Sequence, residues 1–119
     1  MLKYLSLGSA FVSAQTSNNW NLIVSTSKSY HNYRHQSDAC KAYLLLMKNG
    51  ADPSKTITFA YDDIAQHWAN PLKGYIINQP EGHDVYSNCK IDYSKESVNA
   101  KNFIDVMRGQ RSEHLTKTL

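Results

Sequence analysis

The fold is decided by residues 20–61, which read WNLIVSTSKSYHNYRHQSDACKAYLLLMKNGADPSKTITFAY. Leu22–Val24 is a short apolar run between Asn and Ser, a pattern typical of a strand that is buried on both faces. Thr56–Tyr61 is a second run, rich in β-branched and aromatic residues, and it ends at a pair of aspartates. A longer segment with helical periodicity lies between these runs. Strand, helix and strand within about forty residues predict a βαβ unit, and therefore a parallel sheet with a right-handed crossover.

The helix between these strands is expected to begin after Asn32 and to end before Gly50. Asn32 is predicted as its N-cap, because the side-chain oxygen can accept a hydrogen bond from a free backbone N–H. Gly50 stands where a left-handed residue ends many helices. The apolar stripe recurs at helical spacing, and its members are Ala39, Tyr43, Leu44, Leu45, Leu46 and Met47.

The rest of the chain is predicted to add a hairpin and one further helix. Turn residues at Asn70-Pro71 and Gln79–Gly82 flank the apolar runs Tyr75–Ile77 and Val85-Tyr86, which predicts a small irregular hairpin on the surface.

The further helix is expected to be capped by Asn99 and to stop at Gly109, and residues 110–119 form a polar tail that we expect to be disordered. The apolar side of this helix comprises Phe103, Ile104, Val106 and Met107.

Length and composition exclude several classes of protein. A chain of 119 residues forms one modest domain. With 41% hydrophobic and 19% charged residues, it does not have the composition of a disordered chain. The formal charge of +3, from 13 basic and 10 acidic residues, is too small to indicate a nucleic-acid partner. Two cysteines allow at most one intramolecular disulfide, so this is no disulfide scaffold.

The first fourteen residues have the pattern of a secretory signal peptide. Lys3 precedes the apolar run Tyr4–Val12, and small residues end at Ala14, where cleavage is expected. The run is far shorter than the ~20 residues that span a bilayer, so we expect no membrane anchor. The alternative is a first strand of the fold, which the small residues 8–10 disfavour. Residues 15–109 then form the folded domain.

The start of the predicted helix is the first candidate site. In open parallel sheets, ligands bind beyond the carboxyl ends of the strands. The segments Ser25–His35 and Tyr61–Ala65 follow the two strands there, and the first is the more informative because Tyr30–His35 carries two histidines and an arginine. A cation in the first helical turn opposes the helix dipole by a few tenths of a kcal/mol, so Arg34 and His35 indicate a role other than helix stability. Arg34 offers a fork of donors to a carboxylate or amide oxygen. The alternative is an ion pair with Asp38, four residues on.

Two patterns that suggest a metal are interpreted otherwise. His31 and His35 are four residues apart, but the zincin motif needs a Glu where this chain has Asn32, so no metal site is predicted. Asp62-Asp63 could hold Mg²⁺ after the second strand. Such pairs more often accept hydrogen bonds from backbone N–H groups of turns, and we expect that role here.

The two cysteines are not predicted to be nucleophiles. Cys40 lies within the helix and is expected to be a small buried hydrophobe, and Cys89 lies in a polar loop and is expected to be more exposed. Neither follows a strand with a base nearby, as a poised thiolate would.

Several motifs in register resemble the legumain family of asparaginyl endopeptidases. NYRHQSDACKAY here is similar to the family's NYRHQAD-x-CHAY, YDDIA is shared, and NPLKGYIINQPEGHDVY is similar to NPxPGxIINRPxGxDVY. The resemblance covers about residues 19 to 109. The matching segments are Asn32–Tyr43, Tyr61–Ala65, Asn70–Tyr86, Asp92-Tyr93, Asn102-Phe103 and Val106–Gly109.

The resemblance implies a fold and an activity. The fold is α/β, a caspase/legumain-like parallel sheet with flanking helices. This chain supplies only its N-terminal strand–helix–strand unit, the hairpin insertion and one further helix. The implied activity is that of a cysteine-type hydrolase that cuts peptide bonds after asparagine, in the vacuole or lysosome or after secretion. The implied partners are peptides or proteins with exposed asparagine, with no cofactor, no nucleic acid and no stable membrane insertion.

The resemblance also assigns residues. Asn32 matches the asparagine that helps to orient the catalytic histidine, and Arg34 and His35 match residues that line the pocket for the substrate's asparagine side chain. The family's catalytic histidine and cysteine follow later strands and have no counterpart here, so we expect these 119 residues alone to be inactive. The alternatives are a catalytically dead binding or decoy module and a fragment of a GPI transamidase-like subunit, which shares NYRH and the aspartate pair.

Overall fold

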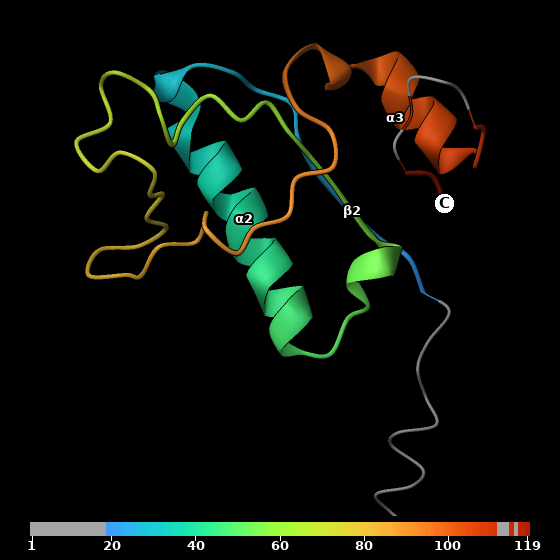
Figure 1. Ribbon diagram of the computed structural model, residues 1–119, viewed down its shortest axis with the longest axis horizontal. Coiled ribbons are helices and arrows are strands. Elements are labelled where there is room, and N and C mark those ends of the chain that lie inside the picture. The colour runs from blue at the N-terminus through green and yellow to red at the C-terminus, as the bar shows by residue number, and fades with distance from the viewer. Residues whose placement is uncertain (1–18, 112–114, 116) are drawn as a thin grey trace, which may run out of the picture.

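The computed structural model describes residues 19–111, 115 and 117–119 (Figure 1). The predicted signal peptide and its strand alternative lie outside this part of the chain. Within it, no helix is long and apolar enough to cross a membrane. The elements in order are β1 (Asn21–Ser25), α2 (Tyr33–Lys48), β2 (Thr56–Ala60) and α3 (Ala100–Met107), with 3₁₀ turns at Tyr30–Asn32, Pro53–Lys55 and Lys95–Ser97.

The sheet confirms the predicted βαβ unit and the α/β class. β1 and β2 pair in parallel, with Leu22 opposite Ile57 and Val24 opposite Phe59, and α2 forms the connection between them. All five residues of β2 are buried. Side chains alternate along a strand, and Ile57 and Phe59 accordingly pack together in one cluster with Val106 of α3.

The expectation that β1 is buried on both faces is wrong. Leu22 and Ile23 are half-buried and Val24 is 39% exposed. The reason is that β1 is an edge strand: among the described residues, only β2 pairs with it. The second edge of β2 is covered, because the Ala60 N–H donates to the Tyr93 carbonyl oxygen at 3.0 Å. The apolar run Leu22–Val24 therefore predicted a strand correctly, but it did not predict that this strand lies at the edge of the sheet.

An apolar hollow of about 490 Å³ lies beside β1, on the side of the sheet that α3 covers. Side chains of both strands, the loop before α3 and α3 itself line it. They are Val24, Thr26, Phe59, Val98, Asn99, Ala100 and Phe103. The open edge of β1 thus adjoins apolar surface rather than a polar loop.

The two ends of α2 differ in how well the sequence predicted them. Gly50 has a φ of +84°, and Ala51 N–H donates to Leu46 O at 3.0 Å, which confirms the predicted left-handed ending. Asn32 does occupy the N-cap position, but its side chain makes no capping bond, so that prediction is wrong. Its Nδ2 donates to Lys28 O at 2.9 Å instead. The preceding 3₁₀ turn runs directly into the helix, so Asn32 lacks the extended backbone that capping needs.

The buried side of α2 is more polar than its sequence predicted. Ala39 and Tyr43 are buried as expected, whereas Leu45 is 48% exposed. Gln36 and Ser37 are buried in addition. The hairpin explains this difference, because it packs over the first half of the helix. Ser37 Oγ donates to Ile77 O at 3.3 Å.

The predicted hairpin is confirmed, but it is not only a surface feature. Ile77 and Asp84 form an antiparallel bridge, and Val85 N–H donates to Ile76 O at 2.8 Å. Ile76 and Val85 are buried and pack in one cluster with Cys40 of α2. The hairpin therefore contributes core side chains.

The loop before the hairpin is held by one buried side chain. Asn70 is 4% exposed, and its Nδ2 donates to the carbonyl oxygens of Ala65 and Tyr75, each at 3.0 Å. Its Oδ1 accepts from Leu72 N–H at 3.0 Å. The predicted turn at Asn70-Pro71 thus depends on the amide of Asn70, which hydrogen-bonds backbone groups on both sides of the turn.

The predicted last helix is confirmed, with less burial than expected. Asn99 Oδ1 accepts from Asn102 N–H at 2.9 Å, as the capping prediction requires, and Gly109 follows the helix with a φ of +66°. Val106 is fully buried, but Ile104 is 43% exposed and Met107 is 50% exposed. One side of α3 therefore remains in solvent.

The described residues of the tail contact the sheet end. Lys117 Nζ donates to Pro53 O at 2.8 Å and to Thr56 O at 2.6 Å, and Leu115 packs beside the cluster that contains Tyr93. Disorder of residues 110–119 as a whole stays a prediction.

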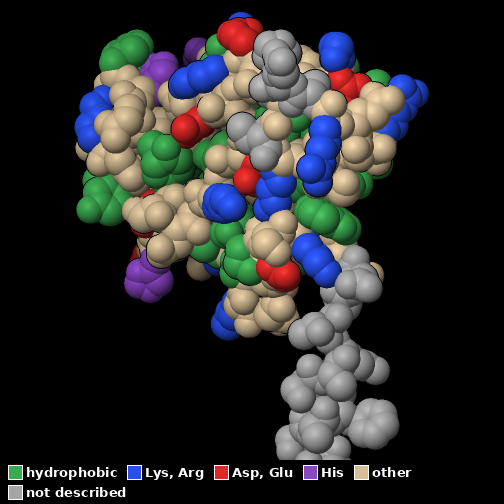
Figure 2. All heavy atoms as spheres, turned by 45° about the vertical axis from the view of Figure 1, so that its right-hand side comes forward, with side chains coloured by type: hydrophobic (Ala, Val, Ile, Leu, Met, Phe, Trp, Pro, Cys, Tyr) green, Lys and Arg blue, Asp and Glu red, His purple; other side chains and the backbone are tan. Residues whose placement is uncertain are grey.

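Figure 2 shows basic side chains spread over one face of the molecule with acidic ones between them.

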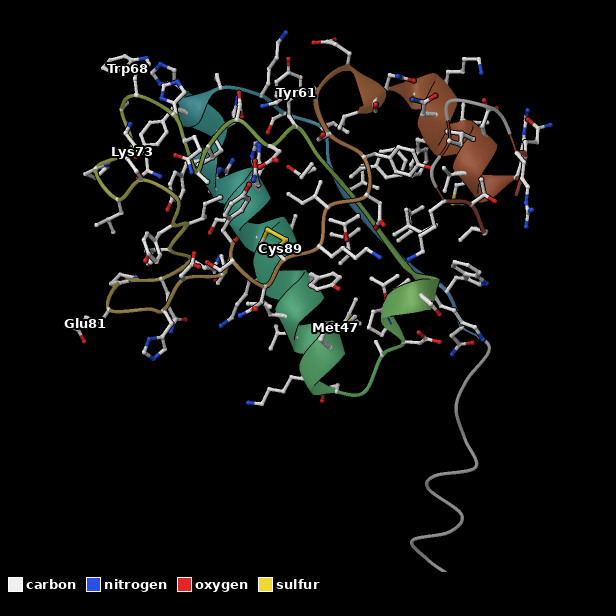
Figure 3. All side chains as sticks on the ribbon, in the orientation of Figure 1. Met47, Tyr61, Trp68, Lys73, Glu81 and Cys89 are labelled. Atoms are coloured by element: carbon white, nitrogen blue, oxygen red, sulfur yellow. A yellow bond between two sulfur atoms is a disulfide. The ribbon has the colours of Figure 1, made fainter. Side chains whose placement is uncertain are left out.

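A disulfide joins Cys40 in α2 to Cys89 in the loop after the hairpin, 49 residues apart (Figure 3). Cys40 is fully buried and Cys89 is half-buried, as predicted. The interpretation of Cys40 as merely a small hydrophobe is nevertheless wrong, because its sulfur is covalently bonded. Both sulfurs are engaged, so neither cysteine offers a thiolate.

Removing this disulfide is expected to destabilise the protein strongly. Closing a loop of about fifty residues lowers the entropy of the unfolded chain by the equivalent of about 4 kcal/mol. Cys89→Ser should lower the free energy of unfolding by about that amount in urea denaturation without reductant. Reductant should lower the free energy of unfolding of the unmutated protein and leave that of the variant unchanged. Equal stability of the two under oxidising conditions would contradict the prediction.

Asp84 organises the hairpin through its two carboxylate oxygens. Oδ1 accepts from the N–H groups of Ile76 at 2.9 Å and Tyr86 at 3.0 Å, and Oδ2 accepts from Ser87 N–H at 3.0 Å. Burial opposes ionisation, but these bonds and the Ser87 hydroxyl outweigh it and lower the pKa of Asp84 to about 2.

This depressed pKa predicts a loss of stability in acid. A folded-state pKa below the unfolded value gives stability that is present above about pH 4 and is lost as the pH falls toward about 2. Asp84→Asn should therefore be less stable than the unmutated protein by about 1–2 kcal/mol near neutral pH. This difference in the free energy of unfolding should disappear as the pH falls toward about 2. Urea denaturation at several pH values measures this difference, and a difference that does not change with pH would contradict the assignment.

Candidate functional site

The loops that follow β1 and β2 are joined at the carboxyl edge of the sheet. Ser29 N–H donates to Asp63 Oδ2 at 2.7 Å, and Gln36 Nε2 lies 3.4 Å from Asp62 Oδ1. The prediction that the aspartate pair satisfies backbone N–H groups is confirmed for Asp63. In the part of the chain that the structure describes, no group of three or more His, Cys, Asp or Glu side chains is placed to hold a metal ion.

This edge also holds strained backbone. Ser29, Asp62 and Lys95 have φ values of 78°, 62° and 51°. Lys95 belongs to the same edge because its N–H donates to Tyr61 O at 3.0 Å. Each such residue costs on the order of 1–3 kcal/mol. Ser29 has a ψ of 155°, which puts it close to a region that is essentially reserved for glycine.

The ring of Tyr61, which is labelled in Figure 3, contacts two lysine side chains at this edge. Lys28 Nζ lies 5.6 Å and Lys95 Nζ lies 5.5 Å from the ring centroid, both within cation–π range. The Tyr61 hydroxyl donates to Glu96 Oε1 at 2.8 Å. The loop after β1 and the 3₁₀ turn before α3 are therefore both bound to the end of β2.

Tyr86 connects the hairpin to the same edge. Its hydroxyl donates to Asp62 Oδ1 at 2.8 Å. Burial and the Asp62 carboxylate together raise the pKa of Tyr86 to about 12, so it remains a donor at physiological pH. Because Tyr86 is three residues from Cys89, the disulfide and this hydrogen bond act on one segment.

A second hollow, of about 400 Å³, lies between the end of β1 and the first turns of α2, and both apolar and polar side chains line it. In it, Ser27 Oγ lies 2.7 Å from His35 Nδ1. Asp38 contributes a carboxylate, whose Oδ1 accepts from Asn78 Nδ2 at 2.8 Å. The lining residues are Ile23, Val24, Ser25, Thr26, Ser27, His35, Asp38 and Ala39. Hydroxyl, imidazole and carboxylate groups together offer donors and acceptors to a small polar ligand.

The structure brings one of the three predicted site residues into this hollow. His35 lines it, whereas Asn32 and Arg34 do not. Arg34 is exposed in the first turn of α2. The alternative ion pair with Asp38 is not formed, since the ion pairs among the described residues join other partners. Arg34 therefore remains available to a ligand.

Ser25 and Ser27 lie in the segment that the sequence placed at this edge, but they were not singled out as site residues. Ser25 is 5% exposed, and its hydroxyl has no hydrogen-bond partner in the described part of the chain. Serine is common after strands, so composition gave no signal. Their position directly after a strand of a parallel sheet was the one usable clue.

A parallel sheet with a hollow that contains a few polar side chains at its carboxyl edge, and a helix start beside it, is the arrangement of α/β domains that bind or transform ligands there. The model of the Peptidase C13 family matches residues 19–118, and the chain belongs to this family of cysteine peptidases.

The chain is similar to plant vacuolar-processing enzymes and to animal legumains. The vacuolar-processing enzyme delta-isozyme of Arabidopsis thaliana is 48% identical over 93 residues, which cover 78% of this chain and 20% of that protein. The vacuolar-processing enzyme of Phaseolus vulgaris is 48% identical over 94 residues, 79% of this chain and 19% of that protein. Legumain of Bos taurus is 47% identical over 90 residues, 76% of this chain and 21% of that protein. The chain thus spans about a fifth of the length of these curated relatives.

Relieving the strain at Ser29 is expected to stabilise the protein. Ser29→Gly removes the Cβ at a φ of 78°. The relief, reduced by the greater freedom of glycine in the unfolded chain, should leave a gain of about 1 kcal/mol. Ser29→Ala is the matched control, because it removes the hydroxyl and keeps the Cβ. Thermal or urea denaturation compares the two, and a glycine variant no more stable than the alanine variant would contradict the strain.

Proposed function

We propose that this chain forms the substrate-pocket part of a cysteine endopeptidase that hydrolyses peptide bonds after asparagine. The observation that carries the proposal is the hollow between β1 and α2, where Ser27 and His35 lie 2.7 Å apart. It occupies the edge of the sheet where ligands bind in α/β folds. The similarity to vacuolar-processing enzymes and legumain supports the reaction class.

The chemistry of an asparagine side chain suits this hollow. A carboxamide has a carbonyl oxygen that needs donors and an NH₂ group that needs acceptors. His35 supplies an N–H donor from inside the hollow, and the exposed guanidinium of Arg34 supplies donors from the neighbouring position. Asp38 lines the hollow and supplies a carboxylate acceptor.

Asn32 is proposed to act on the catalytic histidine rather than on the substrate. Its Nδ2 donates to Lys28 O at 2.9 Å, which holds the amide in one orientation beside the start of α2. A side-chain oxygen held in this way can accept a hydrogen bond from the N–H of an imidazole. That bond sets the tautomer of the imidazole.

The nucleophile is proposed to come from sequence outside these 119 residues. Both cysteines here are bonded to each other, and a disulfide sulfur cannot act as the thiolate that this chemistry needs. The relatives are about five times as long as the matched region. The disulfide also supports a secretory route to a vacuole or lysosome, because such bonds persist in oxidising compartments.

The test is cleavage of an asparagine-containing peptide by the full-length protein at acidic pH. Arg34→Ala removes charged hydrogen bonds worth about 1.5–3 kcal/mol, so KM should rise by about tenfold or more with a smaller effect on kcat. Arg108→Ala is the matched control, because Arg108 is also exposed but follows α3. Cleavage by Arg34→Ala at undiminished efficiency would exclude Arg34 from the pocket. Peptide binding without any cleavage would favour the binding-module alternative.

A further inference from the structure

The hydrogen bond between Ser27 and His35 has a chemical direction that bears on substrate recognition. A neutral imidazole carries its proton on one nitrogen, and the hydrogen bond made by the other nitrogen decides which. Ser27 Oγ lies 2.7 Å from His35 Nδ1, so Nε2 is the ring nitrogen that remains for a ligand. If the Ser27 hydroxyl donates to Nδ1, Nε2 carries the proton and is a donor to the substrate. If the hydroxyl accepts from Nδ1, Nε2 is an acceptor.

We propose that Ser27 is a positioning residue, which donates its hydroxyl hydrogen to His35 Nδ1 and so presents Nε2–H to the side-chain oxygen of a carboxamide substrate. This inference rests on the proposed function, since it concerns the same hollow. A serine hydroxyl has one hydrogen to donate. Within the described part of the chain, His35 Nδ1 is the recorded hydrogen-bond partner of Ser27 Oγ. If Nδ1 carried the proton instead, the hydroxyl hydrogen would lack a protein acceptor there.

The surroundings hold Ser27 in place for this role. Two residues further on, Ser29 is fixed by its 2.7 Å bond to Asp63 Oδ2. Two residues before it, Ser25 ends β1 and is buried. Ser27 thus lies on a short segment anchored at both sides, while His35 lies on the first turn of a regular helix. The bond joins two rigid elements, so it can define the ring orientation.

The carboxylate of Asp38 gives the hollow a preference between similar side chains. An Nε2–H group accommodates the carbonyl oxygen of asparagine, and the Asp38 carboxylate accommodates its NH₂ group. An aspartate side chain would place a second carboxylate near Asp38, and like charges at close range are unfavourable. Asp38 therefore favours a carboxamide over a carboxylate, whereas the Nε2–H that Ser27 presents serves an oxygen of either side chain.

The first experiment reads the proton position directly. The full-length protein is labelled with ¹⁵N-histidine, and the ring nitrogen signals of His35 are assigned by comparison with His35→Gln. The unmutated protein should show the Nε2–H tautomer. Ser27→Ala should shift the signals toward a mixture of tautomers, and Ser27→Thr, which keeps the hydroxyl, should restore the original pattern. Ser54→Ala removes an exposed hydroxyl elsewhere and should change nothing.

The second experiment measures the affinity of the same proteins for an asparagine peptide and for the matching aspartate peptide. Loss of one hydrogen bond of ordinary strength corresponds to about a fivefold weaker affinity. Ser27→Ala should weaken binding of the asparagine peptide by about that factor, and Ser27→Thr should restore it. The preference over the aspartate peptide should remain, because it comes from Asp38. Circular dichroism establishes that each variant is folded.

The outcomes separate this inference from the proposed function. If His35→Gln weakens peptide binding and Ser27→Ala does not, the pocket stands and the role of Ser27 is overturned. An unchanged tautomer in folded Ser27→Ala overturns that role as well. If neither variant alters binding of either peptide, the hollow is not the substrate pocket and the proposed function fails with the inference. A tautomer shift together with weaker, Thr-rescued binding supports both.

Discussion

The hydrogen bond from Ser29 N–H to Asp63 Oδ2 is the constraint on which the carboxyl edge of this sheet depends. It joins the loop after β1 to the loop after β2 at 2.7 Å. It also holds Ser29 in a backbone conformation that a residue with a Cβ rarely adopts. The 3₁₀ turn and α2 begin directly after Ser29, so the placement of His35 follows from this bond.

The hairpin and the loop that follows it also stabilise the carboxyl edge of the sheet. Its core residues pack on α2, the Cys40–Cys89 disulfide ties the following loop to that helix, and Tyr86 donates to Asp62. Asp62 lies next to Asp63, so two separate parts of the chain converge on one short loop. The disulfide, the Tyr86 hydroxyl and the Asp62 carboxylate thus all support the position of the first turns of α2, where Gln36 contacts Asp62.

Local patterns in the sequence predicted the elements well, and long-range partners limited the rest. Gly50 and Asn99 end and begin helices as predicted, because these roles depend only on neighbouring residues. Val24 was expected to be buried and is exposed, because its environment depends on which strands flank β1.

In the candidate site, too, the sequence identified some residues and missed others. Residues with a distinctive chemistry, Arg34 and His35, were identified from the sequence as pocket candidates, and the structure brings His35 into the hollow. Ser27 was not identified, because its importance comes from a contact eight residues along the chain that composition does not signal. The disulfide between Cys40 and Cys89 was permitted by the sequence and became visible only when α2 and the hairpin loop were placed together.

Among the described residues, the outer edge of β1 has no partner strand, and this affects how the region stays soluble. Natural sheets protect a terminal strand with lysine, proline or a bulge that discourages pairing with another chain. β1 reads NLIVS, has none of these residues, and adjoins an apolar hollow. Its composition is that of an interior strand, so the region has the character of a building block whose solubility depends on whatever backbone covers that edge.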